Sequence, residues 1–325
     1  MVNPEGAACV LRELATTGYR FTAVTPTTHQ RVLARRGPRP GTTLHDIFGW
    51  NLPFRTEQLP VRLRGAMAEA GMLEPAGTLS RSNRRVASLD GDLFMHSAFP
   101  TIAADAVFFG PDTYRFARFI KQALTLRQVR TTPDTPVRVL DIGCGTGAGG
   151  IVVARALAAA LRPAVLTMND INPLALSSTF INAQVAGVPI MLAEGDALSS
   201  VAGEFDLIVC NPPYLDDDAQ RAYRHGGTGL GRALSMRIAV QALSRLAPGG
   251  QLLLYTGVAM VEGADPFIED MAPLLAASGC EWTYDEIDPD VFGEEIERPV
   301  YAHIDRIAAV GLIATRPTQN AVREA

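Results

Sequence analysis

The sequence predicts an α/β protein in which a doubly wound sheet occupies the C-terminal part and a smaller α+β unit precedes it. After residue 136, short apolar runs typical of buried strands recur, and helical stretches separate several of them. One run enters the glycine-rich turn Gly143–Gly147, and another stops at Asn211–Tyr214. Sheets of this class bind ligands beyond the carboxyl ends of their strands. We therefore expect the functional residues at those two places.

Residues 1–100 are expected to form the smaller unit, an accessory or substrate-recognition domain. Helical apolar spacing and short alternating strands both occur in it, and the turn Asp90-Gly91 separates the strands. The expected helices lie at residues 5–17 and 59–70, and the expected strands at residues 79–89 and 92–96. Helices followed by a small hairpin indicate a winged-helix-like module.

A helical connector is expected at residues 101–136. Its helix covers residues 116–128, and the turn-rich segment 131–136 closes it. Residues 137–325 are expected to form the catalytic domain, with seven strands. The first strand begins at Val137, and the others are expected at residues 165–168, 190–193, 207–210, 251–255, 281–287 and 307–315.

The turn after the first strand is rich in glycine. Gly143, Gly145 and Gly147 lack side chains, so the backbone can turn sharply and approach a ligand closely. The helical stretch 151–161 follows. This spacing also satisfies the looser dinucleotide fingerprint, so the turn alone does not identify a cofactor.

Acidic residues follow the next two strands. Asp170 is placed to accept hydrogen bonds from a ribose diol, and a nicotinamide enzyme would need the same group. Asp196, beside the apolar Ala197, suits the amino edge and the face of an adenine. Asp196 could instead cap the helix that follows it, and Asp141, before the glycine turn, could be a helix N-cap.

The fourth strand stops at a stiff corner. Pro212 and Pro213 each fix φ near −65° and lack an N–H, and the residue before a proline is kept out of the α region. Asn211 and the carbonyl of Pro212 can accept the two hydrogens of a planar –NH2 group, while Tyr214 stacks on its face. The alternative interpretation is a proline-stiffened loop.

The four motifs, in this order, resemble the class I S-adenosylmethionine-dependent methyltransferase domain with its Rossmann-like sheet, over residues 137–317. The corner resembles the Asn-Pro-Pro-Tyr motif of N-methyltransferases, which holds an amide or exocyclic amine nitrogen in line with the sulfonium methyl. The implied cofactor is S-adenosyl-L-methionine. The residues that the resemblance assigns to it are Asp141, Gly143, Cys144, Gly145 and Gly147 for the methionine part, Asp170 and Ile171 for the ribose, Asp196 and Ala197 for the adenine, and Asn211 beside the methyl.

The methyl acceptor is left open among three classes. Gly226–Leu230 resembles the segment after Asn-Pro-Pro-Tyr in release-factor glutamine methyltransferases, which favours protein glutamine, with Tyr223 or His225 lining the pocket. An adenine or guanine amino group in RNA or DNA is favoured by the corner motif and by the arginines of the first domain. A small metabolite is the third class.

A second likeness to the glutamine enzymes is partial. Gly110–Thr113 is similar to the segment that closes over their cofactor, but it lacks their arginine before the threonine. Phe109, Thr113 and Tyr114 are therefore expected either to roof the cofactor or to pack in the core.

Composition and charge limit the class of protein, its metal content and its location. Hydrophobic residues make up 47% of the 325-residue chain and charged residues 19%, as in soluble globular proteins. The four cysteines and five histidines show no metal-ligand spacing, so no metal is expected. The N-terminus has no apolar signal core, and residues 151–168 are too often interrupted to span a bilayer. A cytoplasmic enzyme without a membrane partner is expected.

Charge is unevenly divided along the chain. Residues 1–136 have 17 Arg and Lys against 11 Asp and Glu, a net of +6, and the remainder has 12 against 23, a net of −11. Arg81, Arg84 and Arg85, near the predicted hairpin, could contact phosphates, but a solvated face is favoured. Asp216–Asp218 is expected in a solvated loop. The acid-rich segment 288–298 is expected either to recognise a cationic or amide-bearing substrate or to form a plain surface loop.

Overall fold

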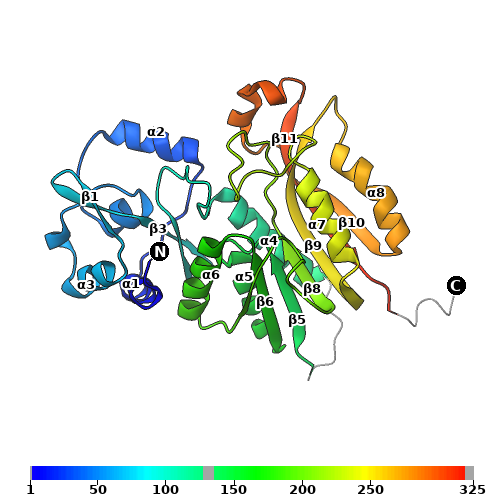
Figure 1. Ribbon diagram of the computed structural model, residues 1–325, viewed down its shortest axis with the longest axis horizontal. Helices are drawn as coiled ribbons and strands as arrows, with labels where there is room; N and C mark the ends of the chain where they lie inside the picture. The colour runs from blue at the N-terminus through cyan, green and yellow to red at the C-terminus, as the bar shows by residue number, and fades with distance from the viewer. Residues whose placement is uncertain (1, 127–134, 319–325) are drawn as a thin grey trace.

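The computed structural model describes residues 2–126 and 135–318 (Figure 1). Its helices are α1 (Pro4–Thr16), α2 (Pro26–Arg36), α3 (Val61–Glu69), α4 (Pro111–Leu126), α5 (Ala148–Ala159), α6 (Pro173–Ala186), α7 (Ala233–Leu243) and α8 (Pro266–Ser278). Its strands are β1 (Leu73–Ala76), β2 (Leu79–Ser82), β3 (Arg84–Leu89), β4 (Asp92–Ser97), β5 (Val137–Ile142), β6 (Ala164–Asp170), β7 (Met191–Glu194), β8 (Phe205–Cys210), β9 (Leu246–Met260), β10 (Glu281–Asp288) and β11 (Arg306–Thr315). Short helical turns are η1 (His45–Gly49), η2 (Thr56–Gln58), η3 (Gly293–Glu297) and η4 (Pro299–Tyr301). Most of the connector expected at 131–136 lies outside the described residues.

Within the described residues, seven strands form one sheet in the order β10-β11-β9-β8-β5-β6-β7. The strands from β9 to β7 are parallel, whereas β11 runs antiparallel to β9 and to β10. Val139 and Val209 pack in the core under α4, α5 and α6, while their neighbours Leu140 and Ile208 pack under α7 and α8. Because successive side chains of a strand point to opposite faces, helices cover both faces. The prediction of a seven-stranded, doubly wound sheet is confirmed.

The N-terminal part has a hydrophobic core of its own, built from α1, α3, η1 and the β3–β4 hairpin. The turn Asp90-Gly91 joins β3 to β4, as predicted. This core rests on α6 of the larger unit, where the Asn182 side chain accepts a hydrogen bond from Met95 N at 2.9 Å and donates one to Met95 O at 3.2 Å. The smaller α+β unit is thus present, and its winged-helix-like character stays a prediction.

The strand β1 and the helix α2 were not predicted, and the single strand expected at 79–89 is divided into β2, which pairs with β1, and β3, which pairs with β4. α2 buries one of its residues, His29, and therefore offers no apolar stripe that periodicity could detect. The His29 ring is held by its contacts, stacking on Phe99 at 4.1 Å and lying 3.1 Å from Trp50 O through Nε2.

The expectation for Arg85 was wrong. Its side chain is 4% exposed, so it lies neither on a solvated face nor where it could contact phosphates. Its guanidinium donates to Ser97 O at 3.2 Å and lies 3.3 Å from Nδ1 of His29. Burial lowers the pKa of this guanidinium to about 10. A β-strand alternates its faces, and β3 turns this arginine inward.

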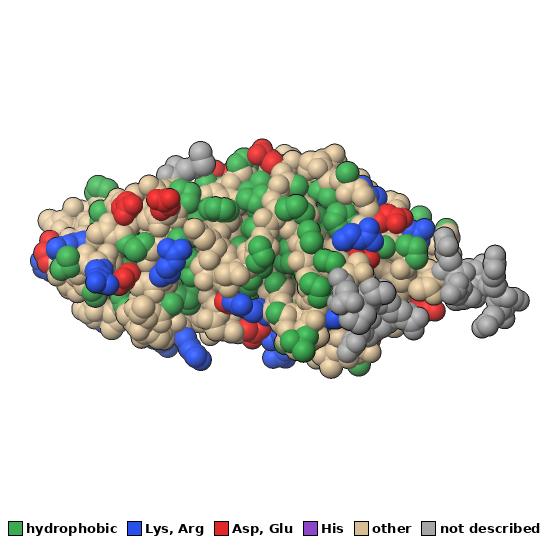
Figure 2. Space-filling model, turned by 90° about the horizontal axis from the view of Figure 1, so that it is seen from below, with side chains coloured by type: hydrophobic (Ala, Val, Ile, Leu, Met, Phe, Trp, Pro, Cys, Tyr) green, Lys and Arg blue, Asp and Glu red, His purple; other side chains and the backbone are tan. Residues whose placement is uncertain are grey.

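The surface shows no dominant charge on the face drawn in Figure 2, where acidic and basic side chains are scattered among hydrophobic ones. No helix in residues 2–126 and 135–318 is both long enough and apolar enough to cross a bilayer.

Candidate functional site

A cavity of about 450 Å³ lies at the carboxyl ends of β5, β6 and β8, within the size range of small-molecule sites. It brings together nearly all the residues that were predicted from the sequence to form the functional site. Those lining it are Asp141, Gly143, Cys144, Gly145, Asp170, Ile171, Asp196, Ala197, Asn211, Pro212, Pro213 and Tyr214. Gly147 is not among the lining residues and is instead the N-cap residue that precedes α5.

The glycine turn is shaped around Asp141. Its carboxylate accepts a hydrogen bond from Gly150 N at 2.7 Å, and the residue is 2% exposed. Burial raises the pKa of Asp141 to about 7. Gly147 has φ +79°, and a Cβ there would lie 3.0 Å from Thr179 Cγ2, so conformation and space both require glycine. Cys144 is buried beside Thr179, with 3.3 Å between Sγ and Oγ1.

Asp170 ties the end of β6 to this turn. Its carboxylate accepts hydrogen bonds from Gly145 N and Asn172 N, both at 2.9 Å. Burial raises its pKa. The next residue, Ile171, is 59% exposed although it is a large apolar side chain, and it lines the cavity. An apolar group left open to a cavity is available to pack against a ligand.

Asp196 lies at a more exposed edge of the cavity. Both of its carboxylate oxygens accept hydrogen bonds from Arg237, at 2.8 Å each, and these bonds lower the pKa of Asp196. A carboxylate has about four acceptor positions, so a ligand amino group can still be bound. Ala197, beside it, is buried and has φ +48°.

The corner presents an open amide. Asn211 is half-buried and lines the cavity, and within the described residues no hydrogen bond occupies its side chain. Tyr214, by contrast, is 7% exposed and its hydroxyl donates to Asp112 Oδ2. Asp112 also accepts a hydrogen bond from Tyr255 at 3.0 Å. The Tyr214 ring reaches the cavity wall while its hydroxyl is anchored.

Asp112 was missed by the sequence reasoning. It lies in the first turn of α4, is 7% exposed and lines the cavity, and burial raises its pKa. The signal was present in Gly110–Thr113, where a proline and an aspartate open a helix. The pattern does not show which distant hydroxyls would donate hydrogen bonds to that aspartate.

The glycines after the corner allow close packing of backbone on backbone. A Cβ at Gly226 would lie 2.6 Å from Tyr214 Cα, and one at Gly231 would lie 2.1 Å from Tyr214 O. Gly257 of β9 leaves room for the Tyr214 ring, which a Cβ there would meet at 2.1 Å. The glycine-rich segment therefore supports the corner directly.

The segment that leads into α4, and α4 itself, supply one wall of the cavity. Thr113 lines it, whereas Phe109 is fully buried in the core and Tyr114 accepts a hydrogen bond from Ala23 N at 2.9 Å. Phe108, next to the expected residue, lines the cavity and stacks on Tyr223 with 5.7 Å between ring centroids. Of the three residues expected to roof the cofactor or to pack in the core, Thr113 therefore lines the cavity, while Phe109 and Tyr114 pack in the core.

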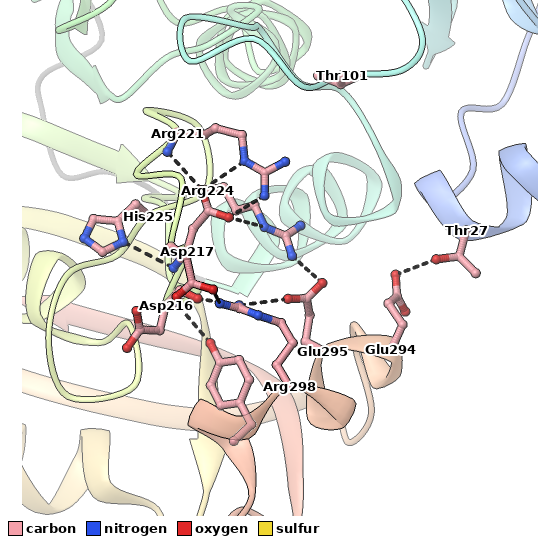
Figure 3. A network of polar contacts seen from close by, with 12 residues as sticks. Thr27, Thr101, Asp216, Asp217, Arg221, Arg224, His225, Glu294, Glu295 and Arg298 are labelled. Atoms are coloured by element: carbon pink, nitrogen blue, oxygen red, sulfur yellow. Dashed lines mark hydrogen bonds and ion pairs between the residues drawn. The ribbon is translucent and has the colours of Figure 1, made fainter.

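The segment after the corner is held by buried ion pairs (Figure 3). Asp217 is 3% exposed and pairs with Arg221 and, at 3.3 Å, with Arg224, so the expectation of a solvated loop was wrong for this residue. The hydrogen bonds from Arg221 lower the pKa of Asp217 to about 2. Tyr223 lines the cavity as one of the two expected residues, while His225 Nδ1 accepts a hydrogen bond from Asp217 N instead.

The acid-rich segment 288–298 joins this network. Glu295 is 7% exposed and pairs with Arg224 and with Arg298, the latter at 3.2 Å. Glu294 accepts a hydrogen bond from Thr27 at 3.1 Å (Figure 3). The segment is therefore more than a plain surface loop, because part of it fixes the cavity wall.

The cavity has two chemically different halves. One half holds the buried carboxylates of β5 and β6, and the other holds the open amide of Asn211 among aromatic side chains. Among the described residues, no group of three or more His, Cys, Asp or Glu is arranged to hold a metal ion. Such a cavity can bind a nucleoside-bearing ligand in the first half and a planar nitrogen group in the second.

Part of the chain is similar to known proteins. Residues 122–260 match the family model described as "Methyltransferase small domain". The chain is 36% identical over 172 residues to a release factor glutamine methyltransferase of Deinococcus radiodurans, covering 49% of this chain and 55% of that protein. It is 40% identical over 125 residues to a ribosomal RNA small subunit methyltransferase C of Pasteurella multocida, covering 38% and 34%.

The chain thus spans about half the length, or less, of the curated relatives that it matches. Among solved structures it is similar to the T. thermophilus 16S rRNA N2 G1207 methyltransferase, with 18% identity, 78% of this chain and 61% of that chain covered, and a TM-score of 0.44. At that score the likeness does not indicate an activity. The resemblance drawn from the motifs is confirmed where the family model matches: residues 122–260 are similar to the methyltransferase small domain.

Proposed function

We propose that this protein is an S-adenosylmethionine-dependent N-methyltransferase that methylates a planar amide or amino nitrogen, with protein glutamine as the acceptor. One observation carries the proposal: the open amide of Asn211 and the buried carboxylates Asp141 and Asp170 line the same cavity. That cavity lies where open α/β sheets bind their ligands. The family match over residues 122–260 supports the choice of chemistry.

The donor set fits S-adenosylmethionine. Asp141 and the glycine turn would hold its cationic methionine part, and Asp170 with Ile171 would hold the ribose. Asp196 and Ala197 would take the amino edge and the face of the adenine. When bound, the cofactor supplies a methyl group on a sulfonium, which is already a reactive electrophile.

The chain's own contribution is to orient the acceptor. The Asn211 amide oxygen and the Pro212 carbonyl would accept the two N–H hydrogens, and the Tyr214 ring, anchored through Asp112, would pack on the face of the acceptor. Accepting both hydrogens draws electron density onto a nitrogen whose lone pair is otherwise delocalised. In this proposal no strongly basic side chain is needed.

Protein glutamine is the acceptor that we favour. The relative from Deinococcus radiodurans is named for release factor glutamine methylation, and the glycine segment 226–231 packs directly against the corner. Both relatives above are named for components of translation, so we place the reaction in the cytoplasm.

A base amino group in ribosomal RNA is the second candidate. The relative from Pasteurella multocida supports it by name. The cavity also suits a flat ring, since Phe108 and Tyr223 both line it. A small metabolite stays the third class.

Transfer of label would decide among these acceptors. Purified protein and S-adenosylmethionine radiolabelled in the methyl group are added to an extract of cells that lack the gene, and the products are separated into protein, nucleic acid and low-mass fractions. We expect counts in protein that are recovered as N-methylglutamine after enzymatic digestion. Counts confined to RNA would move the function to the second candidate, and no transfer into any fraction would overturn the proposal.

A further inference from the structure

Helix α2 begins at the rim of the cavity and leads away from it. Its first turn lines the cavity, and Thr27 there donates to Glu294 on the opposite rim (Figure 3). Residues four apart lie on the same side of a helix, so Arg31 and Arg35 continue the line that starts at Thr27. With a rise of 1.5 Å per residue, their backbone positions follow at about 6 and about 12 Å. We call Arg31 and Arg35 the basic ridge.

The basic ridge is exposed and lacks partners. Neither arginine pairs with a carboxylate within the described residues, whereas Arg36 and Arg39 of the same segment both pair with Asp46. Many arginines of the larger unit are ion-paired too, unlike Arg31 and Arg35. The paired ones are Arg115, Arg138, Arg155, Arg221, Arg224, Arg232, Arg237, Arg298, Arg306 and Arg316.

The opposite rim carries the opposite charge. Residues 288–297 contain five acidic residues and no basic one, and Phe292 in their middle lines the cavity. Asp290 and Glu297 are exposed and pair with no cation among the described residues. We call Asp290, Glu294 and Glu297 the acidic rim. In Figure 1 the orange-red segment that follows β10 lies at the top of the larger unit, to the right of α2.

We propose that the basic ridge and the acidic rim together dock an acceptor polypeptide of mixed charge. Its acidic side chains lie along α2, its basic side chains lie along residues 288–297, and the side chain to be methylated enters the cavity beside the contact between Thr27 and Glu294. A nucleic-acid strand is negative along its whole length, so the acidic rim repels it. A polypeptide can present both signs. This inference rests on the proposed transfer to a protein acceptor, but docking can be measured without any methyl transfer.

The test uses the full-length protein saturated with S-adenosylhomocysteine. Fluorescein-labelled peptides of equal length carry a central glutamine between glycines and have three Glu at one end and three Arg at the other, in both orders. Peptides with Glu at both ends or Arg at both ends, and a single-stranded RNA of similar length, are the comparisons. By fluorescence anisotropy at low salt, one order of the mixed peptide is expected to bind about tenfold more tightly than either like-charged peptide.

Reversing the charge of the basic ridge tests whether the ridge causes the tighter binding of the mixed peptide. Arg31→Glu with Arg35→Glu is expected to weaken binding of the preferred mixed peptide about tenfold, while affinity for S-adenosylhomocysteine is kept because neither arginine lines the cavity. The matched control is Arg62→Glu with Arg64→Glu on α3, which changes the net charge equally and lies away from the cavity. Asp290→Lys with Glu297→Lys is expected to weaken the mixed peptide and strengthen the peptide with Glu at both ends.

Three results would overturn the docking proposal: equal losses from the ridge and α3 variants, no preference among the peptides, or RNA binding that exceeds the mixed peptide and depends on the ridge. Failure of the proposed function is a separate result. Intact ridge-dependent docking without methylation of any glutamine acceptor would reject the chemistry and keep the docking surface.

Discussion

At the scale of single residues, Asn211 differs from Tyr214 nearby, because within the described residues its side-chain amide makes no hydrogen bond. The strand before it is buried along its whole length, and Tyr214 three residues later is tied to Asp112. The two prolines between them restrict the backbone, and the amide is held at the cavity with no hydrogen-bond partner among residues 2–126 and 135–318. An amide without an internal partner is free to bind a ligand.

Replacing this amide should separate catalysis from cofactor binding. We expect Asn211→Ala to lower turnover by about 10²–10³-fold, the size of loss seen when a positioned hydrogen-bonding group is removed from an active site. Affinity for S-adenosylhomocysteine, measured by calorimetry, should stay close to that of the unmodified protein. An equal loss of both would show that Asn211 serves the cofactor instead.

The carboxyl of Asp141 should make cofactor binding depend on pH. Its pKa is raised to about 7 by burial, so it is mostly protonated at pH 6 and mostly ionised at pH 8. Because only the carboxylate attracts the cationic amino group of the cofactor, affinity should rise with pH through this range, by about tenfold between pH 6 and pH 8. Calorimetry with S-adenosylhomocysteine at each pH measures it. Asp141→Asn should bind more weakly with a flat profile, and an unchanged slope in that variant would assign the titration to another group.

At the scale of elements, the first turn of α4 joins parts of the site that are far apart in sequence. Asp112 accepts hydrogen bonds from Tyr214 at the corner and from Tyr255 in β9. Arg115, one turn later, donates to Asp112 and to Asp288 at the end of β10. One helical turn therefore fixes the corner against two strands.

Removal of that carboxylate should destabilise the fold. Asp112→Ala leaves the buried hydroxyls of Tyr214 and Tyr255 without their acceptor, and each such group costs about 1–3 kcal/mol. We expect the free energy of unfolding in urea to fall by about 2–5 kcal/mol, and Asp112→Asn, which keeps an acceptor oxygen, to lose less. A change below about 0.5 kcal/mol in the alanine variant, as at an ordinary surface site, would contradict the role given to Asp112.

At the scale of the whole molecule, the cavity is closed by three regions that ion pairs and hydrogen bonds hold together. Arg224 bridges Asp217 after the corner to Glu295 in the C-terminal part, and Thr27 of the N-terminal part donates to Glu294. Buried charges of this kind depend on their partners, because an unpaired buried ion is costly. The half of the cavity that holds Asn211 therefore depends on all three regions of the chain.

Breaking the bridge should affect acceptor binding more than cofactor binding. Arg224→Ala leaves Asp217 and Glu295 short of one counter-charge, and we expect a roughly tenfold higher KM for the acceptor, a smaller change in kcat and an unchanged affinity for S-adenosylhomocysteine. The matched control is Arg306→Ala, whose pair with Glu286 is exposed and should matter little. Recovery of the KM in Arg224→Lys supports a positioning role, whereas equal losses of acceptor and cofactor binding would reject it.

The sequence by itself determined the seven strands, the two faces of the sheet, the hairpin at Asp90 and, apart from Gly147, the predicted residues from Asp141 to Tyr214 that line the cavity. These follow from periodicity, glycine, proline and the rule that parallel strands present their carboxyl ends together, all of which are local or depend on chain order.

Only the tertiary structure decided the partners of charged side chains. Arg85 and Asp217 look like surface residues in the sequence, but the fold buries both, and Asp112 meets Tyr214, 102 residues away. Whether a charge faces water or a counter-charge depends on what the rest of the chain places beside it, and no local pattern of residues contains that information.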